Sequence, residues 1–249
     1  MWRGARLSGG YAAVFRFGAA ASVRHHTDRI GVFFYKLGMC FSAPVSFVSA
    51  ATLLTLGTVA LRRTRRASEW PFALIPAWFG VQQLLEGGLW LTLEQPQQAY
   101  LNTLLTQCFS VFSQVIWPLY IPLAVWLLEP AGWRRRTMGL LALAGASASF
   151  YLLWYLLRVP AVAQVQGRHI AYIFPHFHQP LATTLYLFGA CVTPLLSGFK
   201  AVRLFGLLAT LSLLTTATFY AQWLISVWCF FAALLSSVIL LHFPQRNAA

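Results

Sequence analysis

Long apolar stretches recur along this chain, separated by short polar connections. A helix that crosses a bilayer needs about 20 consecutive, mostly apolar residues. Stretches of this kind predict about seven transmembrane helices, at roughly residues 42–61, 70–93, 103–128, 137–157, 181–197, 203–219 and 223–241. The fifth is short and contains Pro194, and Pro118 and Pro122 are expected to kink the third. The pattern therefore predicts an all-α, polytopic membrane helix bundle.

Composition supports this class of protein. Hydrophobic residues make up 59% of the chain and charged residues 9%. A soluble domain needs far more polar surface than that, so most of the chain is expected to lie within a membrane.

The positions of the basic residues predict the orientation of the bundle. They cluster in the first, third and fifth connections and in the C-terminal tail: Arg62, Arg63, Arg65, Arg66, Arg134, Arg135, Arg136, Lys200, Arg203 and Arg246. The second and sixth connections carry no basic residue, and the fourth carries only Arg158 and Arg168. Under the positive-inside rule, the N-terminus of the bundle is outside and the C-terminus is cytoplasmic. The net charge of +13 is then explained by topology and by contact with the lipid bilayer, and no nucleic-acid partner is expected.

The first 38 residues conflict with that orientation. They carry six basic residues against a single acid, Asp28: Arg3, Arg6, Arg16, Arg24, Arg29 and Lys36. We expect residues 1–38 to be an over-extended start or a basic N-terminal extension, with residues 39–249 forming the seven-helix domain. An Arg-rich targeting segment, or a weak eighth helix around residues 11–21, are the alternatives.

Glu86 is the single carboxylate inside the predicted helices, and two amides accompany it. An acid at mid-helix costs about 2.5–3.5 kcal/mol on insertion scales, so such a residue indicates a functional site. Gln82 and Gln83 precede Glu86 by four and three positions, which places them on the same side of a helix, and Trp90 follows at four. Gly87 and the glycine after it would let another helix approach. These residues, Glu86, Gln82, Gln83 and Trp90, are the candidate polar site.

Histidines in the predicted external connection suggest a possible metal site. His169, His176 and His178 could join Glu86 as ligands, since imidazole and carboxylate are typical zinc ligands. The spacing lacks the His-Glu-x-x-His pattern of a strong zinc motif. The alternative is an interfacial loop that its aromatic residues hold among the lipid headgroups.

The four cysteines form no Cys-x-x-Cys motif. Cys40 and Cys108 could meet at the outer rim and form a disulfide. Cys191 and Cys229 are expected to be small core residues.

Several short motifs in the first two predicted helices resemble those of a known group of proteins. They are Met39-Cys40-Phe41-Ser42-Ala43, Ser46-Phe47, Ile75-Pro76, Phe79, Gln82-Gln83, Glu86-Gly87 and Trp90. The chain resembles an uncharacterised bacterial family of integral membrane proteins that open with Met-Cys-Phe-Ser-Ala and carry a Gln-Gln-x-x-Glu-Gly-x-x-Trp helix. The resemblance implies a multi-pass protein of the bacterial cytoplasmic membrane and favours Met39 as the natural start. It implies no particular activity.

Three functions agree with these observations. The first is a transport or proton- or cation-linked protein that uses Glu86 as its intramembrane ionisable site. The second is a non-catalytic structural or accessory membrane protein, in which the polar residues only order the bundle. The third is a metal-dependent intramembrane lipid hydrolase with the histidine ligands named above. No cofactor is expected in the first two, and an enzyme is the less favoured reading.

Overall fold

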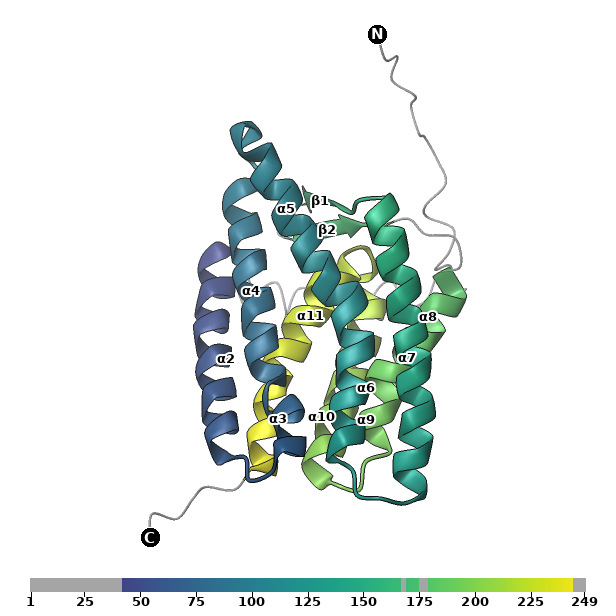
Figure 1. Cartoon of the computed structure of the whole chain (residues 1–249). Coiled ribbons are helices and arrows are strands. Elements are labelled where there is room, and N and C mark those ends of the chain that lie inside the picture. Colours follow the sequence, from purple (N-terminus) through teal and green to yellow (C-terminus); the bar gives the residue numbers. More distant parts are fainter. Residues whose placement is uncertain (1–41, 167–168, 175–178, 244–249) are drawn as a thin grey trace, which may run out of the picture. The chain divides into compact units, whose positions relative to one another are not determined.

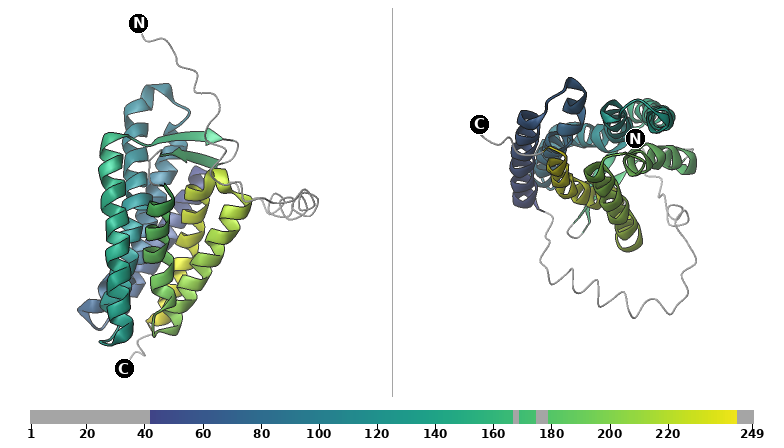
Figure 2. Two further views of the ribbon diagram at one scale, coloured as in Figure 1. Left: turned by 90° about the vertical axis from the view of Figure 1, so that its right-hand side faces the viewer. Right: turned by 90° about the horizontal axis from the view of Figure 1, so that it is seen from below.

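The computed structural model describes residues 42–166, 169–174 and 179–243. All of them belong to the unit Cys40–Ala249. Within these residues the chain is mostly helical, with one β-hairpin at an end of the bundle (Figures 1 and 2).

Ten α-helices occur in the described part of the chain. They are α2 (Ala43–Arg63), α3 (Trp70–Ala73), α4 (Ile75–Thr92), α5 (Ala99–Ser110), α6 (Trp117–Leu128), α7 (Trp133–Arg158), α8 (Gln179–Leu187), α9 (Thr193–Leu195), α10 (Lys200–Phe219) and α11 (Leu224–Leu235). π-Helical segments, Val111–Ile116 and Phe188–Val192, join α5 to α6 and α8 to α9. A 3₁₀ segment, Ser236–His242, extends α11. Each predicted apolar stretch therefore overlaps one continuous helical run, except the second, in which a turn at Leu74 separates α3 from α4.

Five of these runs are long and apolar enough to cross a membrane. They are Ala43–Arg63, Pro96–Leu128, Trp133–Arg158, Lys200–Phe219 and Leu224–His242. The run Pro180–Leu195 is apolar but shorter. The prediction of a helical chain with membrane-length apolar helices is confirmed, whereas the count of seven spans and the orientation of the termini stay predictions.

Two features differ from the sequence-based expectation. The third run begins at Pro96, in a stretch expected to be a loop. The fourth connection contains β1 (Val162–Gln166) and β2 (His169–Ile173), which pair antiparallel with Val162 opposite Ile173. The all-α prediction is therefore incomplete. In β1, Ala163 is buried between exposed neighbours, as expected of a strand with one face on a core, whereas in β2 the consecutive residues Ile170 and Ala171 are both buried.

Small residues set the contact between α2 and α4, which lie side by side (Figure 1). A Cβ added at Gly57 would lie 2.6 Å from the Cβ of Ala77, and one added at Gly80 would lie 3.1 Å from the carbonyl oxygen of Ala50. Gly87 likewise packs against the Phe47 ring of α2. Glycine at these positions lets α2 approach closely and cover one side of α4.

Another close contact involves α6, α7 and the second π-helical segment. Gly145 of α7 and Gly189 of that segment both pack against the carbonyl oxygen of Pro118 in α6. Pro122 lies four residues later and has no N–H to bond this oxygen. The three backbones meet where α6 lacks a helical hydrogen bond.

Candidate functional site

Glu86 lies in the interior of the bundle, on the face of α4 that points away from solvent. Its side chain is 1% exposed, and those of Gln82 and Gln83 are fully buried. Leu84, by contrast, is exposed on another side of the same helix. The structure thus places the three polar residues on the buried side of α4.

Two neutral groups donate hydrogen bonds to the Glu86 carboxyl group. The Ser226 hydroxyl of α11 donates to Oε1 at 2.5 Å, and the Gln83 amide donates to Oε2 at 3.3 Å. Ser226 is itself 1% exposed. The carboxyl group is therefore bridged to a helix that is remote in sequence, by partners that carry no charge.

Gln82 is held by an aromatic side chain from α6. The Trp117 indole N–H donates to Gln82 Oε1 at 2.7 Å, and the Trp117 ring stacks on Phe79 with 3.8 Å between centroids. The Cys229 thiol of α11 lies next to the Gln82 amide. Polar contacts from α4 therefore reach both α6 and α11.

Two atoms of the glutamines lack a hydrogen-bond partner within the described residues. These are Gln82 Nε2, a donor, and Gln83 Oε1, an acceptor. A buried polar atom left without a bond costs about 1–3 kcal/mol. Buried orphan atoms of this kind call for an explanation, which a bound ion, a water or a functional role can supply.

The β-hairpin covers the end of the site. The Tyr172 ring of β2 stacks on Phe109 of α5 at 4.4 Å, and Ile170 packs with Phe109, Leu89 and Cys229 in one apolar cluster. The Tyr172 hydroxyl is buried and has no hydrogen-bond partner among the described residues. Burial, with a smaller contribution from the negative charge of nearby Glu86, raises the pKa of Tyr172 well above its usual value. Tyr172 therefore presents a neutral phenol close to the carboxyl group.

A glutamine of α5 fixes the start of this hairpin. Gln107 donates from Nε2 to the carbonyl oxygen of Ala161 at 2.8 Å and accepts from the Ala161 N–H at 3.3 Å. These paired bonds attach the hairpin to the helix that supplies Phe109.

Trp90 lies in the same apolar cluster as Leu89 and Tyr172 and is partly buried there. It forms part of the apolar wall beside the site, one turn beyond the carboxyl group.

The predicted metal ligands are only partly described. His169 begins β2, and its ring lies 4.7 Å from that of Trp223 and 5.6 Å from that of Tyr220. Burial lowers the pKa of His169, which favours the neutral imidazole. His176 and His178 lie outside the described residues. Within residues 42–166, 169–174 and 179–243 there is no group of three His, Cys, Asp or Glu side chains able to hold a metal ion, so the metal site stays a prediction.

The cysteines are distributed as follows. Cys191 and Cys229 are buried core residues, as predicted. Cys108 is partly buried on α5, and Cys40 lies outside the described residues, so their disulfide stays a prediction.

A second buried carboxylate, Glu129, carries no signal in the sequence that marks it as buried. Glu129 follows α6 and is 4% exposed. It accepts the Ser197 hydroxyl at 2.9 Å and the Gly198 N–H at 3.0 Å, which ties the end of α6 to the connection before α10. Glu129 lies one residue beyond the predicted end of the third helix, so the apolar pattern gave no indication that it would be buried.

Replacing Trp117 with phenylalanine should destabilise the bundle. The change keeps most of the ring packing on Phe79 but leaves Gln82 Oε1 without its donor, which costs about 1–3 kcal/mol for a buried acceptor. Thermal unfolding in detergent measures the loss. Trp126→Phe is a matched control on the same helix, because that indole is only partly buried. Equal unfolding temperatures for the two variants would contradict a role for the Trp117–Gln82 bond.

A family model matches most of the chain. Residues 39–249 match the model of the family described as "Family of unknown function (DUF6629)". No curated protein and no solved structure matches the chain. Because the match covers most of its length, the chain belongs to this family of unknown function.

Proposed function

We propose that this protein is a multi-pass membrane protein linked to the movement of protons or small cations, with Glu86 as the group that exchanges the ion. The observation that carries this proposal is the burial of the Glu86 carboxyl group against two neutral donors. A carboxylate in an apolar interior is costly unless it is neutralised. A proton, or a cation bound at the carboxylate, supplies that neutralisation.

The atoms around Glu86 suit such an ion. The carboxylate, the Ser226 hydroxyl and the orphan Gln83 Oε1 are oxygen ligands, which hard cations prefer. The neutral phenol of Tyr172 closes the same region toward the hairpin and can donate a hydrogen bond. An ion reaching Glu86 from that end would pass this phenol.

The proposed topology has seven spans, with the hairpin outside and the C-terminus in the cytoplasm of a bacterial cell. The first, third and fifth connections, which carry most of the basic residues, lie at the end of the bundle opposite the hairpin (Figure 1). This arrangement follows the positive-inside rule. Helix α4, with 18 residues, would be one of the seven spans, since it packs against both α2 and α11.

One observation favours the structural alternative. The bonds Ser226–Glu86 and Trp117–Gln82 connect α4 to α11 and to α6. Intramembrane polar bonds of this kind can serve packing alone. A purely structural role would leave the protein without ion movement.

Reconstituted protein provides the test. Purified protein in liposomes that enclose a pH-sensitive dye should move protons down an imposed gradient, or should do so when a sodium or potassium gradient is applied. The expected rate is well above that of protein-free liposomes. Folded, reconstituted protein that gives no flux under any of these gradients, and binds none of these ions, would contradict the proposal and favour the structural role.

A further inference from the structure

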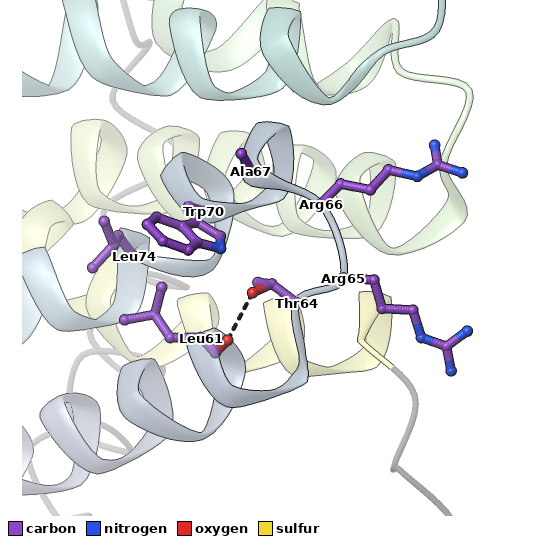
Figure 3. Close-up of a pocket in the computed structure, with 7 residues that line it drawn as sticks. All are labelled: Leu61, Thr64, Arg65, Arg66, Ala67, Trp70 and Leu74. Atoms are coloured by element: carbon purple, nitrogen blue, oxygen red, sulfur yellow. Dashed lines mark hydrogen bonds between the residues drawn. The ribbon is translucent and has the colours of Figure 1, made fainter.

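A cavity of about 600 Å³ opens at the end of α2, beside the connection to α3 (Figure 3). Its lining residues come from the last turn of α2, the connection and α3: Leu61, Thr64, Arg65, Arg66, Ala67, Trp70 and Leu74. It lies at the end of the bundle opposite the hairpin, and Glu86 does not line it.

The lining has an apolar side and a basic side. Leu61, Trp70 and Leu74 gather on one side, and the side chains of Arg65 and Arg66 extend away from them on the other (Figure 3). Trp70 is 57% exposed although it is a large aromatic residue. Tryptophan in this position is typical of the membrane interface, where its ring meets both acyl chains and headgroups.

The connection that carries the arginines is held by local hydrogen bonds. Glu69 accepts the backbone N–H of Arg65 at 2.7 Å and that of Arg66 at 3.3 Å, and the Thr64 hydroxyl donates to the Leu61 carbonyl oxygen at 2.7 Å. Glu69 is thus bonded to the backbone of the two arginines, and their exposed guanidinium groups extend outward.

We propose that this cavity binds an anionic phospholipid. Its phosphate headgroup contacts Arg65 and Arg66, and the part of its acyl chain next to the headgroup lies along Leu61, Trp70 and Leu74. Charge complementarity selects an anionic ligand, because guanidinium groups bind phosphate with paired hydrogen bonds. The apolar side, at the end of a membrane-length helix, selects a lipid over a free anion. The inference rests on α2 crossing the membrane and is independent of the role of Glu86.

Lipid titration monitored by native mass spectrometry of the detergent-purified protein tests this inference. Phosphatidylglycerol should bind as a discrete adduct, and phosphatidylcholine should bind more weakly. The Arg65→Gln/Arg66→Gln variant should bind phosphatidylglycerol about 10- to 30-fold more weakly, since each basic residue near a membrane surface contributes roughly a fivefold effect. The control is Arg134→Gln/Arg136→Gln, a second exposed pair in another basic connection, which should retain the wild-type affinity.

Four outcomes would overturn the proposal. Equal losses of phosphatidylglycerol affinity in the two double-arginine variants would indicate diffuse charge attraction. Equal affinity of the wild-type protein for phosphatidylglycerol and phosphatidylcholine would indicate an unselective apolar groove. Displacement of the lipid by millimolar inorganic phosphate would assign the arginines to free phosphate instead. Trp70→Ala serves as a second variant should the arginine pair unfold, and an unchanged affinity in that variant would also contradict the site.

Discussion

Replacing Gly145 with alanine should lower the unfolding temperature of the detergent-purified protein markedly, with a loss of about 1–3 kcal/mol or more from overpacking. The added Cβ would overlap the carbonyl oxygen of Pro118 in α6. A backbone atom cannot rotate out of the way as the end of a side chain can. The whole of α7 would have to move away from α6.

The surroundings of Gly145 leave little room for that movement. Gly189 of the second π-helical segment packs on the same carbonyl oxygen and on the Cα of Gly145. A shift of α7 would therefore disturb two contacts at once. Alanine is the better helix former by about 1 kcal/mol, so the observed loss is the overpacking cost reduced by that gain.

Gly139→Ala is the matched control on the same helix. The Cβ added there would lie 3.3 Å from Nε1 of Trp126, at the end of a side chain that can adjust. We expect this variant to unfold at the wild-type temperature or slightly above it. Thermal unfolding followed by intrinsic tryptophan fluorescence distinguishes the two changes. If Gly145→Ala unfolded at the same temperature as Gly139→Ala, α7 could not lie as close to the Pro118 carbonyl oxygen as the structure shows.

The helical runs could be predicted because a bilayer imposes a length and a composition on any segment that crosses it. The polar face of α4 could be predicted for a related reason, since the helical repeat places Gln82, Gln83 and Glu86 on one side. Both features depend on residues close together in the sequence.

The residues that bond to Glu86 and Gln82 are set by the tertiary fold, and the spacing of residues along the sequence does not identify them. Ser226 is 140 positions from Glu86, and Trp117 is 35 positions from Gln82. A serine and a tryptophan in apolar helices are common, so nothing marks these two in advance. Tyr172 reaches the site only because its connection forms a hairpin that packs on Phe109, whereas the sequence suggested an interfacial loop.

Glu129 shows how one residue at a helix boundary can change an interpretation. The apolar stretch ends at Leu128, so the pattern gives no indication that the next residue is buried. Burial follows from the fold, because the connection before α10 covers Glu129 and donates two groups to it. The chain therefore has two buried carboxylates in the described residues, with different surroundings.

Glutamine substitutions at these two carboxylates should have opposite consequences. Glu86→Gln keeps the size of the side chain and an oxygen that can accept the Ser226 hydroxyl, but it can no longer take up and release a proton or supply a negative charge to a cation. Flux in liposomes should fall to the level of protein-free liposomes. The unfolding temperature should stay the same or rise slightly, because a neutral amide is easier to bury than a carboxylate.

Glu129→Gln should instead destabilise the protein by about 1–3 kcal/mol while leaving flux intact. Both oxygens of Glu129 lie within hydrogen-bond distance of the Gly198 N–H, and one of them also accepts the Ser197 hydroxyl. A glutamine offers only one acceptor oxygen. Its amide N–H groups would then face the Ser197 hydroxyl or the Gly198 N–H, which are both donors. Flux and thermal unfolding measured on the same preparations separate the two variants. Wild-type flux in Glu86→Gln, together with a lower unfolding temperature, would mean that Glu86 only stabilises the bundle through Ser226.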